Sequence, residues 1–388
     1  MDVLHDQLEF LKKENLYRTL REVESPQSAA MVIDGKRVVQ FSSNDYLGLA
    51  NHPRLKAAAQ EAIETYGSGA GASRLVSGNL VLNGQLEKKI SHLKKQESGL
   101  LFNTGYMANM GIINALVGEG DVIFSDQLNH ASIVDACRMS KAETKVYPHK
   151  DMDALEEVLR KSEHYKQRLL VTDGIFSMDG DIAPLPDLVK LTDRYECVLM
   201  VDDAHGTGVL GANGGGTGEH FGLEDKIDVS MGTFGKALGG FGAFAAGDRT
   251  LRPFLINCAR SFMFTTGLPP AVIASALAAL ELLEEEPALR EKLWENVHFF
   301  RRGIEKLGFT INQSETPIIP LLVGDASLTM QMGEMLFKKG VFMQGIRPPA
   351  VPQGSSRLRI TIMATHTVEQ MEYALEALEA VGKQLRII

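Results

Sequence analysis

Short apolar runs alternate with helical patterns along the middle of the chain, from about residue 44 to residue 275. The runs are Val122–Phe124, Leu169–Val171, Val198–Val201, Val229–Met231 and Ala243–Ala245. Strands that are apolar almost throughout are typical of sheets buried on both faces, and intervening helices allow successive strands to run parallel. The pattern predicts an α/β fold with a mostly parallel central sheet and helices on both faces.

Two further segments flank this region. Residues 1–43 have the pattern of an N-terminal arm, with a charged helix carrying Leu8, Leu11, Leu16 and Leu20 and then a hairpin at about 34–36. Residues 276–388 mix helices with strands at 318–323 and 358–362. A chain of 388 residues is long enough for two domains. We therefore expect an arm (1–43), a large domain (44–275) and a small C-terminal α+β domain (276–388).

The charge of the chain excludes several classes of partner. Asp and Glu number 49 against 40 Lys and Arg, a formal charge of −9, which leaves no broad basic surface for nucleic acid. No basic run suggests a membrane surface, and the longest apolar helix candidate, 270–280, is too short to cross a bilayer. Residues 1–6 lack the features of a signal peptide. We expect a cytoplasmic protein.

Cysteine and histidine spacing favours neither a disulfide framework nor a metal site. Cys137, Cys197 and Cys258 are isolated, and the ten histidines form no His-Glu-x-x-His pattern. We expect buried cysteines and no metal.

Polar clusters follow three of the apolar runs, where ligands bind in open α/β sheets. Asp202 follows 198–201, Ser177 lies shortly after the run at 169–171, and Thr233 and Lys236 follow 229–231. A lysine amine can condense with an aldehyde cofactor, and a carboxylate can keep a pyridine nitrogen protonated. Taken singly, a helix cap and a solvated lysine are the more ordinary interpretations. Together, Lys236 and Asp202 predict an enzyme that carries pyridoxal 5′-phosphate (PLP).

Two helix starts add to this prediction. Gly105 and Tyr106 open a helix after an apolar strand, where free backbone N–H groups bind phosphate; a tight turn without a ligand is the alternative. His130 begins another helix and places a ring where it can stack on a cofactor; a capping or packing histidine is the alternative.

A glycine-rich segment at 67–72 matches a dinucleotide-binding fingerprint in form. It follows an amphipathic helix, 53–66, and not a strand, so the required context is missing. We instead expect a substrate-facing loop that leads to Ser73 and Arg74.

At the strand expected near 358–362, alternation from residue 357 onward places Arg357 and Arg359 on one face. One of these arginines can hold a substrate carboxylate through paired hydrogen bonds. Two solvated arginines on an edge strand are the alternative.

Several blocks together resemble the α-oxoamine synthases, a family of fold-type I PLP enzymes. They span nearly the whole chain and are residues 41–49, 129–132, 176–180, 201–208, 233–236 and 357–360. Members condense an amino acid with an acyl thioester and release carbon dioxide. The resemblance implies a homodimer with active sites at the subunit interface.

The resemblance also assigns roles residue by residue. Lys236 is similar to the Schiff-base lysine and Asp202 to the partner of the pyridine nitrogen. His205 would donate to the ring hydroxyl, His130 would stack on the ring, and Ser177 would lie beside it. The phosphate would be held by Gly105, Tyr106 and Thr233, together with Thr265 or Thr266 from the second subunit. The amino-acid carboxylate would be held by Asn44 and Arg359.

Two segments resemble different branches of this family. Residues 346–352, with Arg347 followed by two prolines, are similar to the branch that joins L-alanine to a pimeloyl thioester, giving 8-amino-7-oxononanoate for biotin biosynthesis. Residues 231–240 are closer to the glycine C-acetyltransferases, so glycine, an acetyl thioester or broad specificity are alternatives. The sequence does not decide whether the acyl carrier is coenzyme A or acyl carrier protein. It also does not decide whether Arg18 and Arg347 bind the carboxylate at the far end of the acyl chain. A non-catalytic partner subunit is disfavoured because Lys236 is present.

Overall fold

The computed structural model describes residues 2–13, 16–312 and 314–388. Its strands are β1 Ala30–Ile33, β2 Lys36–Gln40, β3 Ser98–Phe102, β4 Val122–Asp126, β5 Glu143–Tyr147, β6 Arg168–Asp173, β7 Val198–Asp202, β8 Val229–Thr233, β9 Ala243–Gly247, β10 Ile318–Gly324, β11 Val341–Phe342, β12 Gln344–Ile346 and β13 Ser356–Thr361. Its α-helices are α1 Asp2–Lys13, α2 Pro53–Tyr66, α3 Val81–Leu93, α4 Gly105–Leu116, α5 Ala131–Met139, α6 Met152–Arg160, α7 Leu185–Tyr195, α8 Thr217–Phe221, α9 Leu251–Cys258, α10 Arg260–Met263, α11 Pro270–Glu285, α12 Ala288–Lys306, α13 Ala326–Lys338 and α14 Val368–Gln384.

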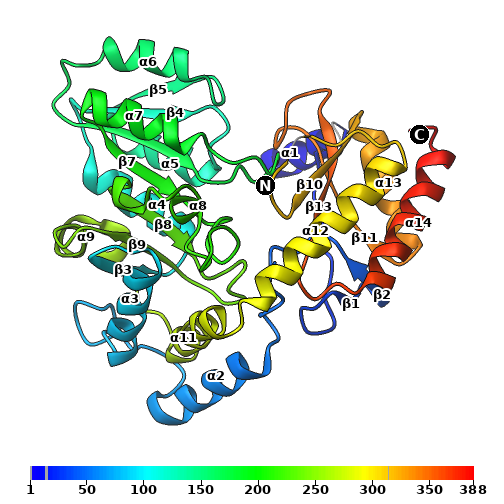
Figure 1. Cartoon of the computed structure of the whole chain (residues 1–388), viewed down its shortest axis with the longest axis horizontal. Helices are drawn as coiled ribbons and strands as arrows, with labels where there is room; N and C mark the ends of the chain where they lie inside the picture. The colour runs from blue at the N-terminus through cyan, green and yellow to red at the C-terminus, as the bar shows by residue number, and fades with distance from the viewer. Residues whose placement is uncertain (1, 14–15, 313) are drawn as a thin grey trace.

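A seven-stranded sheet in the order β3-β9-β8-β7-β6-β4-β5 forms the centre of one lobe (Figure 1). The strands from β5 to β8 pair in parallel, and β9 runs antiparallel to both β8 and β3. The mostly parallel sheet predicted from the apolar runs is thus confirmed. The sequence pattern missed β5, because this edge strand, Glu-Thr-Lys-Val-Tyr, is largely exposed and carries few apolar residues.

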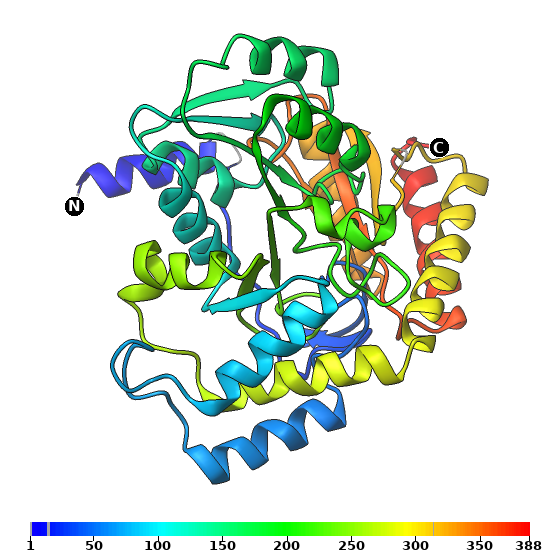
Figure 2. The same cartoon turned by 60° about the vertical axis from the view of Figure 1, so that its left-hand side comes forward.

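Alternate residues of each strand enter different cores, which is why the strands are apolar almost throughout. Ile123 of β4 packs into a core formed with α4, α5 and α9. Its neighbours Val122 and Phe124 pack into a second core with α6 and α7 on the opposite face. Helices therefore cover both faces of the sheet, as expected (Figure 2).

The second lobe contains a three-stranded antiparallel sheet, in the order β10-β13-β12, with α12, α13 and α14 beside it (Figure 1). The long helices α11 and α12 lead from the first lobe to this one. Placing β13 between two strands buries all six of its residues.

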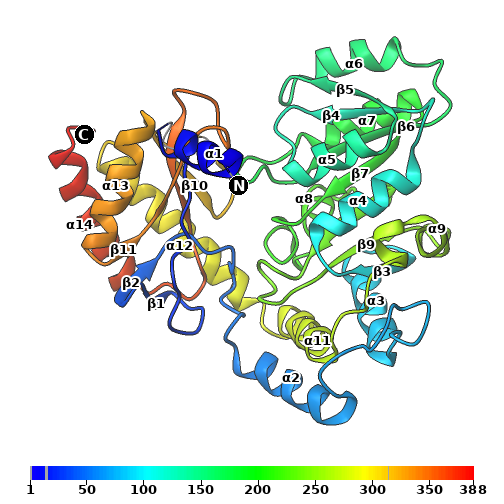
Figure 3. The ribbon, with the colours of Figure 1, turned by 180° about the vertical axis from the view of Figure 1, so that it is seen from behind.

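The N-terminal segment folds onto the second lobe (Figure 3). The hairpin expected near Asp34 and Gly35 is formed by β1 and β2, and β2 also pairs in parallel with β11. The predicted first helix is too long: α1 ends at Lys13, so Leu16 and Leu20 lie beyond it. Within the described residues, no helix combines the length and apolar character needed to span a membrane.

Candidate active site

A cavity of about 160 Å³ lies beside the carboxyl ends of β6, β7 and β8. Eight of the residues singled out in the sequence line it: Gly105, Tyr106, His130, Ser177, Asp202, His205, Thr233 and Lys236. Ser132, Asp173, Ala204, Met231 and Gly235 complete the wall. The clusters after separate strands thus meet in one place, because parallel strands bring their carboxyl ends to the same edge of a sheet.

Lys236 and Asp202 follow neighbouring strands, and Asp202 stands opposite Met231 in the register of β7 and β8. Burial lowers the pKa of the Lys236 amine, and the nearby Arg359 acts in the same direction, against the opposing effect of Asp202 and Asp173. A depressed pKa increases the fraction of neutral amine, which is the form that acts as a nucleophile or base.

The Asp202 carboxylate is held at both oxygens. Oδ1 accepts from the Ala204 backbone N–H at 3.0 Å, and Oδ2 accepts from the Asn109 amide at 2.8 Å. Asp202 is buried. Such a fixed carboxylate can receive a hydrogen bond from a pyridinium nitrogen in the cavity.

His205 is buried in the wall of the cavity, with its Nδ1 2.8 Å from the hydroxyl of Tyr46. Burial, together with Lys236, holds the pKa of His205 well below its usual range, so the ring stays neutral. Tyr46 is also buried and lies 3.4 Å from Asn44 Oδ1.

His130 both caps α5 and faces the cavity. Its Nδ1 accepts from the Ser132 backbone N–H at 3.2 Å, while its own backbone N–H donates to Asp173 Oδ2 at 2.7 Å. The capping interpretation is confirmed, and the same residue also lines the cavity. Burial lowers the pKa of the ring, so His130 is neutral near pH 7.

The start of α4 has the geometry of an anion site. Thr104 Oγ1 accepts from Met107 N at 3.1 Å, and the first-turn N–H groups of Gly105 and Tyr106 have no intrahelical partner. A Cβ on Gly105 would meet Met231 Cε at 3.3 Å, so glycine keeps this wall open. The helix start, the fixed carboxylate and the buried amine fit PLP in one cavity.

Ser73, Thr265 and Thr266 are among the predicted residues that do not line this cavity. Ser73 forms an isolated bridge with Thr266. Asn103 Nδ2 donates to Thr265 Oγ1 at 3.3 Å and to the Thr266 carbonyl at 2.8 Å.

Arg359 reaches from the second lobe toward the cavity. Its Nε donates to the Ser177 carbonyl at 2.6 Å and its Nη1 to Asn44 Oδ1 at 3.1 Å, so the two proposed carboxylate-binding residues are adjacent. Arg357 donates to the Met178 carbonyl and pairs with Asp179. The alternative of solvated edge-strand arginines is wrong, because β13 is the central strand and both side chains are buried.

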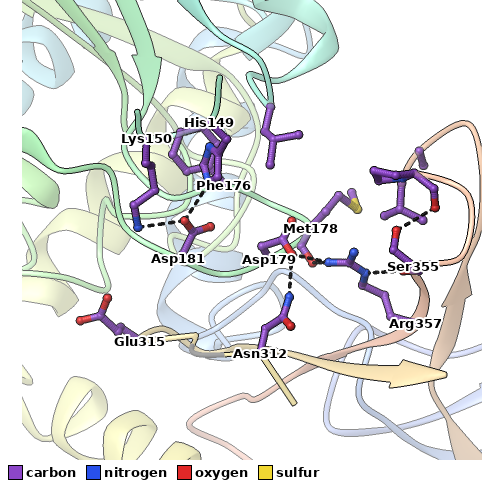
Figure 4. A pocket seen from close by; sticks show the side chains of 14 residues that line it. His149, Lys150, Phe176, Met178, Asp179, Asp181, Asn312, Glu315, Ser355 and Arg357 are labelled. Carbon is purple, nitrogen blue, oxygen red and sulfur yellow. Dashed lines mark hydrogen bonds and ion pairs between the residues drawn. The ribbon is translucent and has the colours of Figure 1, made fainter. Parts of the chain in front are cut away.

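A larger cavity of about 610 Å³ lies beside the 176–181 segment (Figure 4). Phe176, Met178, Asp179 and Asp181 of that segment line it, and Arg357 and Asn312 enter it from the second lobe. Ser177, between Phe176 and Met178, lines the smaller cavity instead. The segment therefore separates the two.

Arg18 and Arg347, far apart in the sequence, line a third cavity of about 340 Å³. The Arg347 guanidinium donates to the Tyr17 carbonyl at 3.1 Å. Arg18 lies beyond the end of α1 and is exposed. Ala350 lines both this cavity and the large one.

Sequence reasoning missed Asn109, Ser132, Tyr46 and Asp173. Asp173 ends β6 as Asp202 ends β7, and the two residues stand opposite each other, so the criterion used for Asp202 would have found it. Asn109 lies four residues after Gly105 in α4 and so shares its face. Tyr46 had no such signal.

The aminotransferase class I and II family matches residues 36–378. The chain belongs to that family. The 8-amino-7-oxononanoate synthase of Citrifermentans bemidjiense is 52% identical over 390 residues, covering 100% of both chains. That of Thermoanaerobacter pseudethanolicus is 48% identical over 389 residues, covering 100% of this chain and 98% of the relative.

Among solved structures, a serine palmitoyltransferase variant from S. paucimobilis with a bound PLP–myriocin aldimine superposes with a TM-score of 0.94. It is 31% identical, and the match covers 100% of this chain and 98% of the other. The predicted membership of the α-oxoamine synthases and the fold-type I PLP transferase fold are confirmed.

Proposed function

We propose that this protein is a PLP-dependent acyltransferase that condenses L-alanine with a pimeloyl thioester. The products are 8-amino-7-oxononanoate, carbon dioxide and the free thiol carrier, and the role is in biotin biosynthesis. One observation carries the proposal. The cavity that joins Lys236 to Asp202, His205 and His130 occurs in a chain about half identical, end to end, to 8-amino-7-oxononanoate synthases.

PLP, when bound, supplies an electron sink that makes the α-hydrogen of the amino acid acidic. Gly105, Tyr106 and Thr233 would hold its phosphate, Asp202 its ring nitrogen and His205 its hydroxyl. His130 would stack on the ring with Ser177 beside it. Asn109 and the Ala204 N–H hold Asp202 so that its charge stays aligned with the ring nitrogen.

Lys236 would move the proton. Its amine, whose neutral form burial favours by lowering the pKa, would take the α-hydrogen of the substrate and later return a proton to the product. Arg359 and Asn44 would bind the substrate carboxylate and so orient the bond that breaks. His130 would donate a hydrogen bond to the thioester oxygen as negative charge develops there.

The acyl chain would enter from the large cavity, with Arg18 and Arg347 at its far carboxylate. The support is their shared cavity, which meets the large one at Ala350. Glycine C-acetyltransferase activity, or broad specificity, is the second candidate because residues 231–240 resemble that branch. Coenzyme A and acyl carrier protein both remain candidate carriers. A non-catalytic partner subunit does not account for the buried Lys236 amine.

The remaining sequence-based assignments are part of this proposal. The protein would be a cytoplasmic homodimer in which Thr265 or Thr266 of one chain completes the phosphate site of the other. Ser73 would face the substrate from the loop that bridges to Thr266. The arm, large domain and small domain would divide near residues 43 and 275.

Replacing Lys236 by alanine tests the proposal. We expect the purified Lys236→Ala protein to lose visible absorbance of lysine-linked PLP and to lose turnover together, because one amine performs both tasks. Lys190→Ala is the control, since Lys190 is exposed on α7 and pairs with Asp187 in the same helix, away from the cavity. Absorbance and turnover at the level of the control would contradict the assignment.

A further inference from the structure

Asn109 connects two cofactor-facing residues through one buried amide. Its side chain is fully buried in α4, and its Nδ2 lies 2.8 Å from Asp202 Oδ2 and 2.8 Å from Ser132 Oγ. An amide nitrogen carries two hydrogens, so both contacts can be made at once. A single residue thus touches the carboxylate beside the ring nitrogen and the residue that contacts His130.

The orientation of this amide follows from its neighbours. Asn109 Oδ1 has no hydrogen-bond partner in the described part of the chain. Turning the amide over would place that oxygen 2.8 Å from a carboxylate oxygen, where both atoms are acceptors. Because that repulsion replaces a charge-assisted hydrogen bond, the arrangement with Nδ2 toward Asp202 is favoured.

The donor and acceptor roles in the contact between Ser132 and His130 follow from the same arrangement. Ser132 Oγ accepts from Asn109, so the serine proton is free to donate to His130 Nδ1, which lies 2.7 Å away. The Ser132 backbone N–H points at the same Nδ1 at 3.2 Å. A backbone N–H can only donate, so this contact requires Nδ1 to be an acceptor, and the Ser132 hydroxyl can then donate to the same nitrogen. The hydrogen of the neutral ring therefore lies on Nε2.

We propose that Asn109 and Ser132 are positioning residues that hold His130 as the Nε2–H tautomer while Asn109 also aligns Asp202. This tautomer leaves His130 with a hydrogen to donate, which stabilisation of a thioester oxyanion requires. The opposite tautomer would present a lone pair to the oxyanion. The effect on turnover rests on the proposed function, whereas the tautomer does not.

The first test uses the unmodified holoenzyme with ¹⁵N-labelled histidine. The His130 ring signals are assigned by their loss in His130→Asn. We expect a proton-bearing Nε2 and a proton-free Nδ1 in the absence of substrates. A proton on Nδ1 would overturn the proposal, whatever substrates the enzyme uses. This measurement needs no variant at Asn109 or Ser132, so it stands even where those variants fold poorly.

The second test compares Ser132→Ala, Ser132→Thr and Asn109→Leu. Ser132→Ala removes the hydroxyl, and Asn109→Leu keeps a similar volume without a donor. We expect kcat to fall by about 10- to 100-fold in both, with KM changed far less, because the donor is misplaced after substrate has bound. Ser132→Thr should recover most of kcat, since it restores the hydroxyl.

Asn109→Leu should also weaken PLP binding to the apoprotein, while Ser132→Ala should not, because the Asn109 side chain hydrogen-bonds Asp202 whereas the Ser132 hydroxyl contacts Asn109 and His130. The control is Asn114→Leu in the same helix, whose amide contacts the Met110 and Ala136 carbonyls instead. Wild-type kcat in both Ser132→Ala and Asn109→Leu would overturn the proposal. The proposal would also be overturned if kcat fell as much in Ser132→Thr as in Ser132→Ala.

Discussion

His149 lies between two carboxylates at the wall of the large cavity (Figure 4). Its Nδ1 is 2.9 Å from Asp126 Oδ1 and its Nε2 is 2.9 Å from Asp181 Oδ2, which Lys150 also contacts at 3.0 Å. Its ring meets Phe176 edge to face. Burial disfavours the charged ring, but the hydrogen bonds to Asp126 and Asp181 outweigh it and raise the pKa of His149 to about 9.

The raised pKa predicts a loss of stability at alkaline pH. Charged His149 stabilises the fold fully below the unfolded-state pKa of about 6.5, and this stabilisation is lost as the pH rises through about 9. A shift of this size corresponds to on the order of 3 kcal/mol. Denaturant unfolding of wild type and His149→Gln from pH 6 to pH 10 measures it. The wild-type advantage should shrink across that range, and a constant difference would contradict the prediction.

Residues that act directly at the end of a strand were predictable, whereas those that act through others were not. Lys236 and Asp202 each follow an apolar strand, so their meeting followed from the parallel sheet. The contacts that Asn109 and Tyr46 make depend on the directions in which side chains from separate elements point. No local pattern encodes that relation.

At the scale of elements, the 176–181 segment is fixed by the second lobe. Gly180 has a φ of +69°, and its carbonyl accepts from Ser314 Oγ at 3.1 Å and Thr316 Oγ1 at 2.8 Å. A Cβ at this position would lie 2.4 Å from the Ile318 carbonyl oxygen. The segment that carries Ser177 thus depends on close approach to the start of β10.

Gly180→Ala should therefore cost both stability and activity. The left-handed backbone and the clash with Ile318 together predict a loss of about 2 kcal/mol or more in the free energy of unfolding. Turnover should fall too, because Ser177 and the Arg359 contact shift with the segment. Gly222→Ala is the matched control, since Gly222 is also left-handed, with φ +65°, but has open space around it. Equal losses in the two variants would rule out the close approach as the cause.

Apolar strands and glycine-rich turns were the easier elements to predict. The five apolar runs became β4, β6, β7, β8 and β9 because burial on both faces leaves an unbroken apolar pattern. The arginines of β13 were ambiguous, since a sequence does not state whether a strand lies at the edge or the centre of its sheet. The pairing of β2 with β11, some 300 residues later, had no local signature at all.

At the scale of the whole molecule, the two lobes contribute different parts of the proposed site. The first carries Lys236, Asp202, His205 and His130, and the second brings Arg359 and the cavity lined by Arg18 and Arg347. Under the proposed function, the chemistry and the acyl selection would thus be built on separate sheets. Because of this separation, the residues at the strand ends were enough to predict the class of reaction. The choice of acyl donor needed the comparison with relatives.

The most direct test of the account is the catalytic efficiency of the holoenzyme with each pairing of L-alanine or glycine with pimeloyl, succinyl or acetyl thioesters. We predict that L-alanine with the pimeloyl donor exceeds every other pair by at least about tenfold, equivalent to about 1.4 kcal/mol. In Arg347→Ala, the preference for the pimeloyl donor should shrink while the acetyl donor is little affected. A wild-type enzyme that uses glycine with the acetyl donor as well as or better than this pair would contradict the proposed function.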